Sequence, residues 1–137
     1  MSALRRAACL LAVGGFVLVA CTNTQSPANR RPQSGAATAS VIAGVQQITI
    51  QAGDDYRFHP STITVHPGKV EVILHHPGTG APHNWQLTGF PADFVPLTAA
   101  GQTSKATFIA PAPGKYRFIC TIHVAQGQTG TLIVKQP

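Results

Sequence analysis

The sequence predicts an all-β fold, an antiparallel sandwich of about seven to eight strands, over residues 44–137. In this part of the chain, apolar and polar residues alternate in short stretches rich in β-branched and aromatic side chains, as is typical of strands with one buried face. Pro and Gly separate the stretches, and no segment has the apolar spacing of an amphipathic helix. Seven or so strands in 94 residues fit an antiparallel sandwich.

The predicted strands follow one another at short intervals. In chain order they cover residues 45–50, 63–65, 70–74, 85–87, 106–110, 116–120 and 131–134. Turns are expected at residues 66–68, 77–80 and 111–114, where Pro and Gly cluster. Within the strands, we expect Trp85 and Phe118 to lie in the core.

Residues 1–20 resemble an export signal. Arg5 and Arg6 precede an apolar run, residues 7–20, that is too short to span a bilayer comfortably. A small residue then precedes Cys21, as in the lipobox of bacterial lipoproteins, where the cysteine is acylated and becomes the new N-terminus. We therefore predict a lipid anchor at Cys21 and a location on the extracytoplasmic face of the cell membrane, in the periplasm or at the cell exterior. The alternative is an ordinary cleaved signal in which Cys21 is incidental.

Residues 21–43 are predicted to be a flexible tether between this anchor and the folded domain. The segment is rich in small and polar residues, and it has too few large apolar side chains to form a core. The folded domain is therefore expected to cover residues 44–137.

The charge balance excludes one class of partner. Beyond the signal, eight Lys and Arg stand against four acids, without a basic run or interleaved aromatic residues. Nucleic acid is therefore not an expected partner. Two alternatives remain: a modest attraction to an anionic membrane or an acidic partner, and a mildly basic surface without a function.

Cysteine usage indicates a metal site. Cys9 leaves with the signal and Cys21 carries the lipid, so the exported domain contains one thiol, Cys120, and cannot form an internal disulfide. A lone thiol in an oxidising compartment is a liability unless something occupies it. Metal ligation is one stable solution.

Two histidines accompany this thiol. His123 follows Cys120 by three residues, and His83 precedes a predicted strand. One thiolate and two imidazoles in a plane, with a weak axial donor, are the ligands that select copper in blue electron-transfer sites. Zinc sites more often have two or more thiolates, or three ligands and a water. We therefore predict one copper ion.

The chain resembles a known family, the cupredoxins or plastocyanin-like blue copper proteins, over about residues 45–135. The matching segments are Phe58-His59-Pro60, Ile63-Thr64-Val65, Gly68, Pro82-His83-Asn84, residues 113–116, Cys120-x-x-His123 and Gly127-Gln128-x-Gly130. The resemblance implies a Greek-key sandwich with copper near one end. It also implies that Asn84 holds the cysteine loop through hydrogen bonds, a role common around metal sites.

Gln128 stands where plastocyanin-like proteins usually have an axial Met, and stellacyanin-like members have a Gln there. An amide oxygen is a harder donor than a thioether, so axial ligation by Gln128 would favour Cu(II) and lower the reduction potential. The alternative is that Gln128 points away and leaves a three-coordinate site.

The other titratable residues receive smaller roles. His59 and His66 flank turn prolines and are expected to be solvated. For His75 and His76, a position near the copper or weak binding of a second ion is the less favoured interpretation. The loop acids Asp54, Asp55 and Asp93 are assigned no chemistry.

These residues predict a carrier of single electrons rather than an enzyme. Cys120 is flanked by Ile119 and Thr121 rather than by histidines, and its loop contains a single cysteine in a single domain, so further copper centres are not expected. We expect a monomer that exchanges electrons with an unidentified redox partner. The alternative is a lipoprotein that sequesters or delivers copper without a redox role. Ligation buried in a rigid sandwich, without a Met-rich or His-rich tail, favours the carrier.

Overall fold

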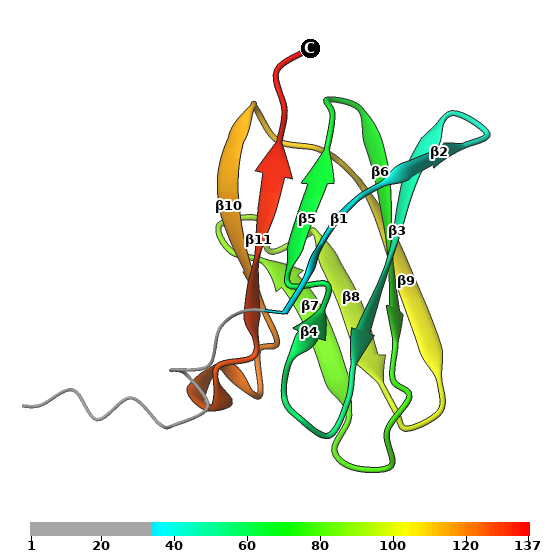
Figure 1. Cartoon of the computed structure of the whole chain (residues 1–137), viewed down its shortest axis with the longest axis vertical. Helices are drawn as coiled ribbons and strands as arrows, with labels where there is room; N and C mark the ends of the chain where they lie inside the picture. Colours follow the sequence, from blue (N-terminus) through cyan, green and yellow to red (C-terminus); the bar gives the residue numbers. More distant parts are fainter. Residues whose placement is uncertain (1–33) are drawn as a thin grey trace, which may run out of the picture.

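The computed structural model describes residues 34–137, which form two β-sheets packed face to face (Figure 1). The predicted signal and the predicted lipidation site at Cys21 lie outside the described residues and stay predictions. Among the residues described, no helix is both long enough and apolar enough to cross a membrane.

The first sheet has six strands. In spatial order they are β1 (Ala36–Thr38), β5 (Thr62–Val65), β11 (Thr129–Val134), β10 (Gly114–Ile119), β7 (His83–Leu87) and β8 (Phe94–Thr98). This sheet carries the ends of the strands from which the candidate metal ligands project.

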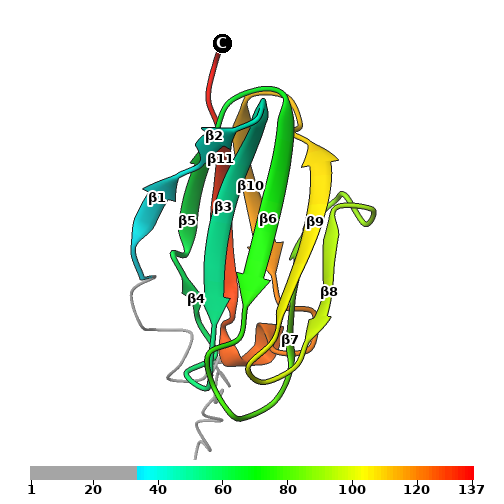
Figure 2. The same ribbon diagram turned by 90° about the vertical axis from the view of Figure 1, so that its right-hand side faces the viewer.

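The second sheet has five strands. Its order is β2 (Ser40–Ile42), β3 (Val45–Ala52), β6 (Lys69–His75) and β9 (Thr103–Ile109), and β4 (Phe58–His59) pairs with the far end of β3. Figure 2 shows the two layers side by side, with β1 and β2 running from one sheet to the other. Ala39 lies at this crossing, where its N–H donates to the carbonyl of Thr64 at 2.9 Å.

The all-β sandwich predicted from the sequence is confirmed, and each of the seven predicted strands is present. The structure differs in two respects. The described residues form eleven strands rather than seven or eight, and both sheets are mixed rather than purely antiparallel. The pairs β1–β5, β5–β11 and β3–β6 are parallel. These pairs are parallel because, between the two paired strands, the chain crosses to the other sheet and returns.

The predicted boundary of the tether at residue 43 is wrong, because residues 36–42 form β1 and β2. These strands were missed because each has only three residues, and neither has the apolar alternation of a buried strand. Their hydrogen bonds come from backbone pairing with β5 and β3, and Ala37 and Ala39 pack against the core. Strand β8 was missed for another reason. It contains Pro96, which is tolerated because β8 is an edge strand.

The core lies between the sheets and is built from the inward-facing residues of each strand. Trp85 and Phe118 are fully buried, as predicted, with ring centroids 5.4 Å apart. Phe58 and Phe108 extend this aromatic cluster, at 5.2 Å from Phe118 and 5.7 Å from Trp85 respectively. The cluster fixes β7 and β10 against the opposite sheet, and both strands lead directly to candidate ligands.

Three connections meet at one end of the sandwich: residues 53–57 after β3, residues 76–82 after β6, and residues 120–128 after β10. They lie together at the bottom of Figure 1. We call this the metal end. The turn between β2 and β3 and the C-terminus lie at the other end, which we call the distal end.

Candidate metal centre

The three predicted copper ligands come together at the metal end. His83 is the first residue of β7, Cys120 directly follows β10, and His123 precedes the 3₁₀ turn η2 (Val124–Gln126). All three side chains are buried, and their ligand atoms lie within 4.8 Å of one another. Strand ends from the same sheet therefore bring a thiol and two imidazoles to one point.

The imidazoles face each other through the same type of nitrogen. Nδ1 of His83 lies 3.1 Å from Nδ1 of His123, which lies 3.5 Å from Sγ of Cys120. The amide oxygen Oε1 of Gln128, which is fully buried, lies 2.8 Å from Nδ1 of His83. The side chain of Gln128 therefore contacts the imidazole of His83 in the interior.

Backbone hydrogen bonds hold this ligand loop in a tight conformation. The N–H of Cys120 donates to the carbonyl of Gln128 at 3.0 Å, and the N–H groups of His123 and Gln128 donate to the carbonyls of Cys120 and His123 at 3.2 Å. Gly127 adopts φ 85°, a left-handed conformation that favours glycine. At Gly130, a Cβ would collide with the ring of Phe118 and the carbonyl oxygen of Ser61, so only glycine fits there.

Asn84 joins the two ligand loops. Its Oδ1 accepts from the N–H of Thr121 at 2.8 Å, and its Nδ2 donates to Oγ1 of Thr121 at 2.7 Å. Asn84 follows His83 and Thr121 follows Cys120. These are the hydrogen bonds expected from the resemblance, and they fix the separation of one imidazole and the thiol.

His76 lies beside the centre without offering it a ligand atom. It is fully buried, and its ring centroid is 4.7 Å from that of His83. Nε2 donates to the carbonyl of Ala81 at 2.9 Å, and Nδ1 accepts from the N–H of Gly78 at 3.0 Å. His75 instead contacts Oγ1 of Thr103 at 3.0 Å. The structure therefore places His76 as a packing partner of His83 that also holds the adjoining loop.

Two residues that sequence reasoning missed complete the surroundings. The ring of Tyr56 meets His123 edge-on at 4.7 Å and His83 at 6.0 Å, on a backbone with φ 55°. Arg57 is buried, and its Nη1 donates to the carbonyls of Gly127 at 2.9 Å and Gln126 at 3.3 Å. Neither has a sequence signal, because both roles depend on contacts with a loop about 70 residues away.

Asp54, to which no chemistry was assigned, has a structural role. Its carboxylate accepts from the N–H groups of Thr79 at 3.1 Å and Gly80 at 2.9 Å, and these bonds lower the pKa of Asp54 below its usual value. They tie the loop before His83 to the loop that carries Tyr56.

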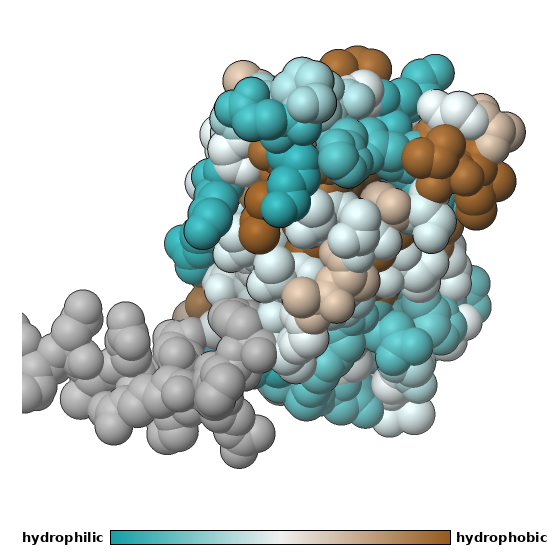
Figure 3. Space-filling model, turned by 45° about the horizontal axis from the view of Figure 1, so that its top comes forward, coloured by the Kyte–Doolittle hydropathy of each residue, from teal (hydrophilic) through white to brown (hydrophobic). Residues whose placement is uncertain are grey.

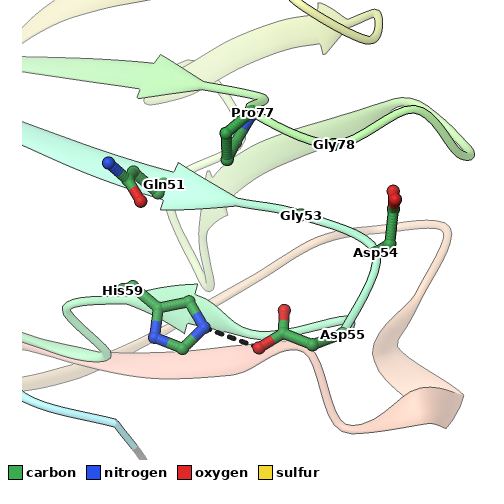
Figure 4. Close-up of a pocket in the computed structure, with 7 residues that line it drawn as sticks. All are labelled: Gln51, Gly53, Asp54, Asp55, His59, Pro77 and Gly78. Atoms are coloured by element: carbon green, nitrogen blue, oxygen red, sulfur yellow. Dashed lines mark hydrogen bonds and ion pairs between the residues drawn. The ribbon is translucent and has the colours of Figure 1, made fainter.

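Asp55 and His59 line a surface hollow of about 310 Å³ beside this loop (Figure 4). Nε2 of His59 lies 2.7 Å from Oδ2 of Asp55, and Nδ1 lies 2.7 Å from Oγ of Ser34. His59 is exposed, as expected, and none of the predicted copper ligands lines the hollow.

Burial also changes the pKa of His83. Desolvation lowers the pKa of His83 below its ordinary value of 6.5, and the nearby His123 and His76 lower it further. The hydrogen bond with Gln128 acts in the opposite direction. The net effect favours a neutral imidazole, which is the form that ligates a metal.

The donor set fits copper better than zinc. A thiolate, two imidazoles and an amide oxygen combine one soft ligand with harder ones in a buried site, which suits a copper ion that changes between Cu(I) and Cu(II). A structural zinc site would usually provide more thiolates.

Solved structures share this fold. The chain is similar to auracyanin A, a "blue" copper protein of Chloroflexus aurantiacus, with 24% identity and a TM-score of 0.59 over 67% of this chain and 100% of that one. It is similar to the dithionite-reduced auracyanin of Roseiflexus castenholzii, with 23% identity and a TM-score of 0.57 over 64% and 95%. It is also similar to the metal-binding domain, with Cu(I), of the Cu(I)-exporting P-type ATPase CopA of Streptococcus pneumoniae, with 22% identity and a TM-score of 0.59 over 75% and 98%.

At these identities the similarities show a shared fold. No curated protein matches the sequence significantly. The family model of the cupredoxin-like domain matches residues 11–134, which is most of the chain. Together with the buried thiol and imidazoles at one end of the sandwich, this match assigns the family: the chain belongs to the cupredoxin-like domain proteins.

Proposed function

We propose that this protein carries single electrons through one copper ion bound by His83, Cys120 and His123, with Gln128 as a weak axial donor. The observation that supports this most is the convergence of a buried thiol, two imidazole Nδ1 atoms and an amide oxygen at one point. Copper in such a site would supply the one-electron couple between Cu(I) and Cu(II).

The surrounding residues suit this function because they restrict ligand movement. Asn84 links the two ligand loops, and Arg57 binds two carbonyls of the ligand loop. Tyr56 and His76 pack against the imidazoles. A preorganised ligand set needs little rearrangement when the charge on the metal changes, and small rearrangement favours rapid electron exchange.

A route for electrons is suggested by the surface near His123. This side chain is buried but retains 7% exposure, and its neighbours Ile122 and Val124 are exposed apolar residues. A small apolar surface beside a ligand suits weak, short-lived docking. The proposed partner is an unidentified redox protein, and the carrier is proposed to act as a monomer.

The location of this function rests on the N-terminal sequence. We propose that residues 1–20 are a signal peptide and that acylated Cys21 anchors the protein to the extracytoplasmic face of the membrane. Electrons would then be exchanged outside the cytoplasm.

The second candidate is copper sequestration or delivery. The fold alone does not decide between them, because a metal-binding domain of a copper exporter has it as well as the auracyanins. Burial of the ligand set favours the carrier, since delivery requires ligands that a recipient can reach.

Visible and electron paramagnetic resonance spectra of the Cu(II)-loaded protein test this proposal. We expect an intense sulfur-to-copper charge-transfer band in the red, with one copper per chain. A colourless protein that keeps zinc in the presence of excess copper would contradict it.

A further inference from the structure

The distal end of the sandwich combines exposed apolar side chains with lysines. One row of residues crosses the outer face of the five-stranded sheet there. Ile42 pairs with Val45, and Lys69 pairs with Ile109. Strands β3 and β6 are parallel, and Gln46 pairs with Val70. Val45 therefore lies beside Lys69, and the two pairs form one continuous row.

These side chains face solvent. Ile42 is 53% exposed, Ile109 is 66% exposed, and Val41, in the same β2 strand, is 70% exposed. An apolar patch is visible at the right of Figure 3, over the turn between β2 and β3. The core does not require these residues, so their exposure needs another explanation.

Three lysines lie at the same end of the sandwich as this patch. Lys69 lies within the row, and Lys115 and Lys135 lie at the same end of the other sheet, where Gly114 pairs with Val134. All three lysines are exposed. The two ion pairs of the described residues, Lys105 with Glu71 and His59 with Asp55, do not involve them.

The acids are distributed differently. Asp54 and Asp55 lie in the loop at the metal end, Glu71 is paired with Lys105, and Asp93 lies in the connection between β7 and β8. The distal end therefore carries three exposed lysines, and the metal end carries two exposed carboxylates beside the buried Arg57. A negatively charged planar surface would therefore attract the distal end more strongly than the metal end.

We propose that the distal end docks on an anionic lipid surface, with Val41 and Ile42 entering the headgroup region and Lys69, Lys115 and Lys135 contacting lipid phosphates. Basic residues beside exposed apolar side chains are the combination that binds membrane interfaces. The metal end then faces away from the membrane, toward aqueous partners.

The chain length permits this orientation. Ser34 lies near the metal end, where its Oγ donates to the carbonyl of Phe58. The chain between positions 21 and 34 can span about 43 Å when fully extended. This exceeds the length of the eight-residue strand β3, about 26 Å. A lipid anchor at Cys21 is therefore compatible with docking through the opposite end.

The test uses the full chain reconstituted in vesicles whose lipids carry brominated acyl chains, which quench tryptophan fluorescence on contact. Trp85 is fully buried, so the unsubstituted chain gives the baseline. The Ile42→Trp variant reports the distal end. The matched control is Gln51→Trp, because Gln51 is exposed near the other end of the same sheet, beside the metal end.

In vesicles of brominated phosphatidylcholine and phosphatidylglycerol, we expect quenching of the Ile42→Trp variant well above the baseline and little quenching of Gln51→Trp. Quenching should be lost in vesicles of pure phosphatidylcholine. It should also be lost in 1 M salt, where the Debye length falls to about 3 Å. The substitutions Lys69→Glu, Lys115→Glu and Lys135→Glu should have the same effect. Each lysine contributes roughly fivefold to the affinity for an anionic surface.

Several outcomes would overturn the proposal. Equal quenching of both tryptophan variants would show that the domain has no preferred orientation, and stronger quenching of Gln51→Trp would reverse it. If the quenching of Ile42→Trp did not depend on lipid charge, the lysines would not bind lipid phosphates. If the fluorescence emission of Ile42→Trp shifted with protein concentration in the absence of vesicles, a second copy of the chain would cover the patch instead of lipid.

Discussion

The amide oxygen of Gln128 lies 2.8 Å from Nδ1 of His83, in the interior of the protein and 45 residues away along the chain. This contact aligns the final loop with the start of β7. His83 also belongs to the group of buried ligand atoms that Cys120 and His123 complete.

Replacing Gln128 with Met should raise the reduction potential. A thioether is a softer donor than an amide oxygen, so it stabilises Cu(I) relative to Cu(II). Each rise of about 59 mV corresponds to a tenfold change in the one-electron equilibrium. Potentiometric titration of both copper-loaded proteins measures the shift. An unchanged or lower potential in the variant would mean that the Gln128 side chain does not act on the metal.

Removing the thiol should abolish the red absorption band. Cys120→Ser replaces the soft ligand with a hydroxyl that cannot give the sulfur-to-copper transition, while His83→Ala and His123→Ala should alter or remove the band. The intensity of the band is measured by visible absorption spectroscopy as each protein is titrated with Cu(II). His59→Ala is the matched control, because His59 is exposed and does not belong to the ligand group. A band that survives in Cys120→Ser would exclude thiolate ligation.

The candidate ligands could be predicted from the sequence because their spacing is local or follows strand ends. Cys120 and His123 are three residues apart, and His83 opens a strand that the alternation pattern identified. Arg57 and Tyr56 could not be predicted, because a buried arginine and an aromatic ring over two imidazoles leave no local pattern. The crossing strands β1 and β2 were missed for a similar reason, since backbone pairing rather than apolar side chains holds them.

Acidification should destabilise the metal-free protein through His83. Burial lowers the pKa of His83 in the folded state, so below pH 6.5 the unfolded chain binds more protons at this residue than the folded chain does. The free energy of unfolding should therefore fall as the pH is lowered from 6.5 toward the folded-state pKa. Urea unfolding across this range, compared between the wild type and His83→Gln, isolates the effect. Identical pH slopes for the two proteins would contradict a depressed pKa.

Cys21→Ala should release the protein from membranes or leave the signal uncleaved. The predicted lipid provides the main hydrophobic anchor. Stable membrane attachment usually needs two signals, such as two acyl chains or one chain and a basic patch, so the loss of the lipid should release the protein. Detergent partitioning and the mass of the mature N-terminus distinguish the two results. Cys9→Ala is the control, because Cys9 is predicted to leave with the signal. Equal partitioning of wild type and Cys21→Ala, with the same N-terminus, would show that Cys21 is not acylated.

Val124→Glu should separate electron transfer from copper binding. Val124 is exposed next to His123, so a carboxylate there would disturb an apolar docking surface without replacing a ligand. We expect slower electron exchange with redox partners and an unchanged copper spectrum. Stopped-flow oxidation and reduction give the first rate, and transfer of copper to a chelator gives a second rate for the wild type. Val41→Glu is the matched control, because Val41 is exposed at the distal end. If wild-type copper leaves within seconds while electrons cross slowly, the protein delivers copper, because a carrier must exchange electrons faster than it loses its metal.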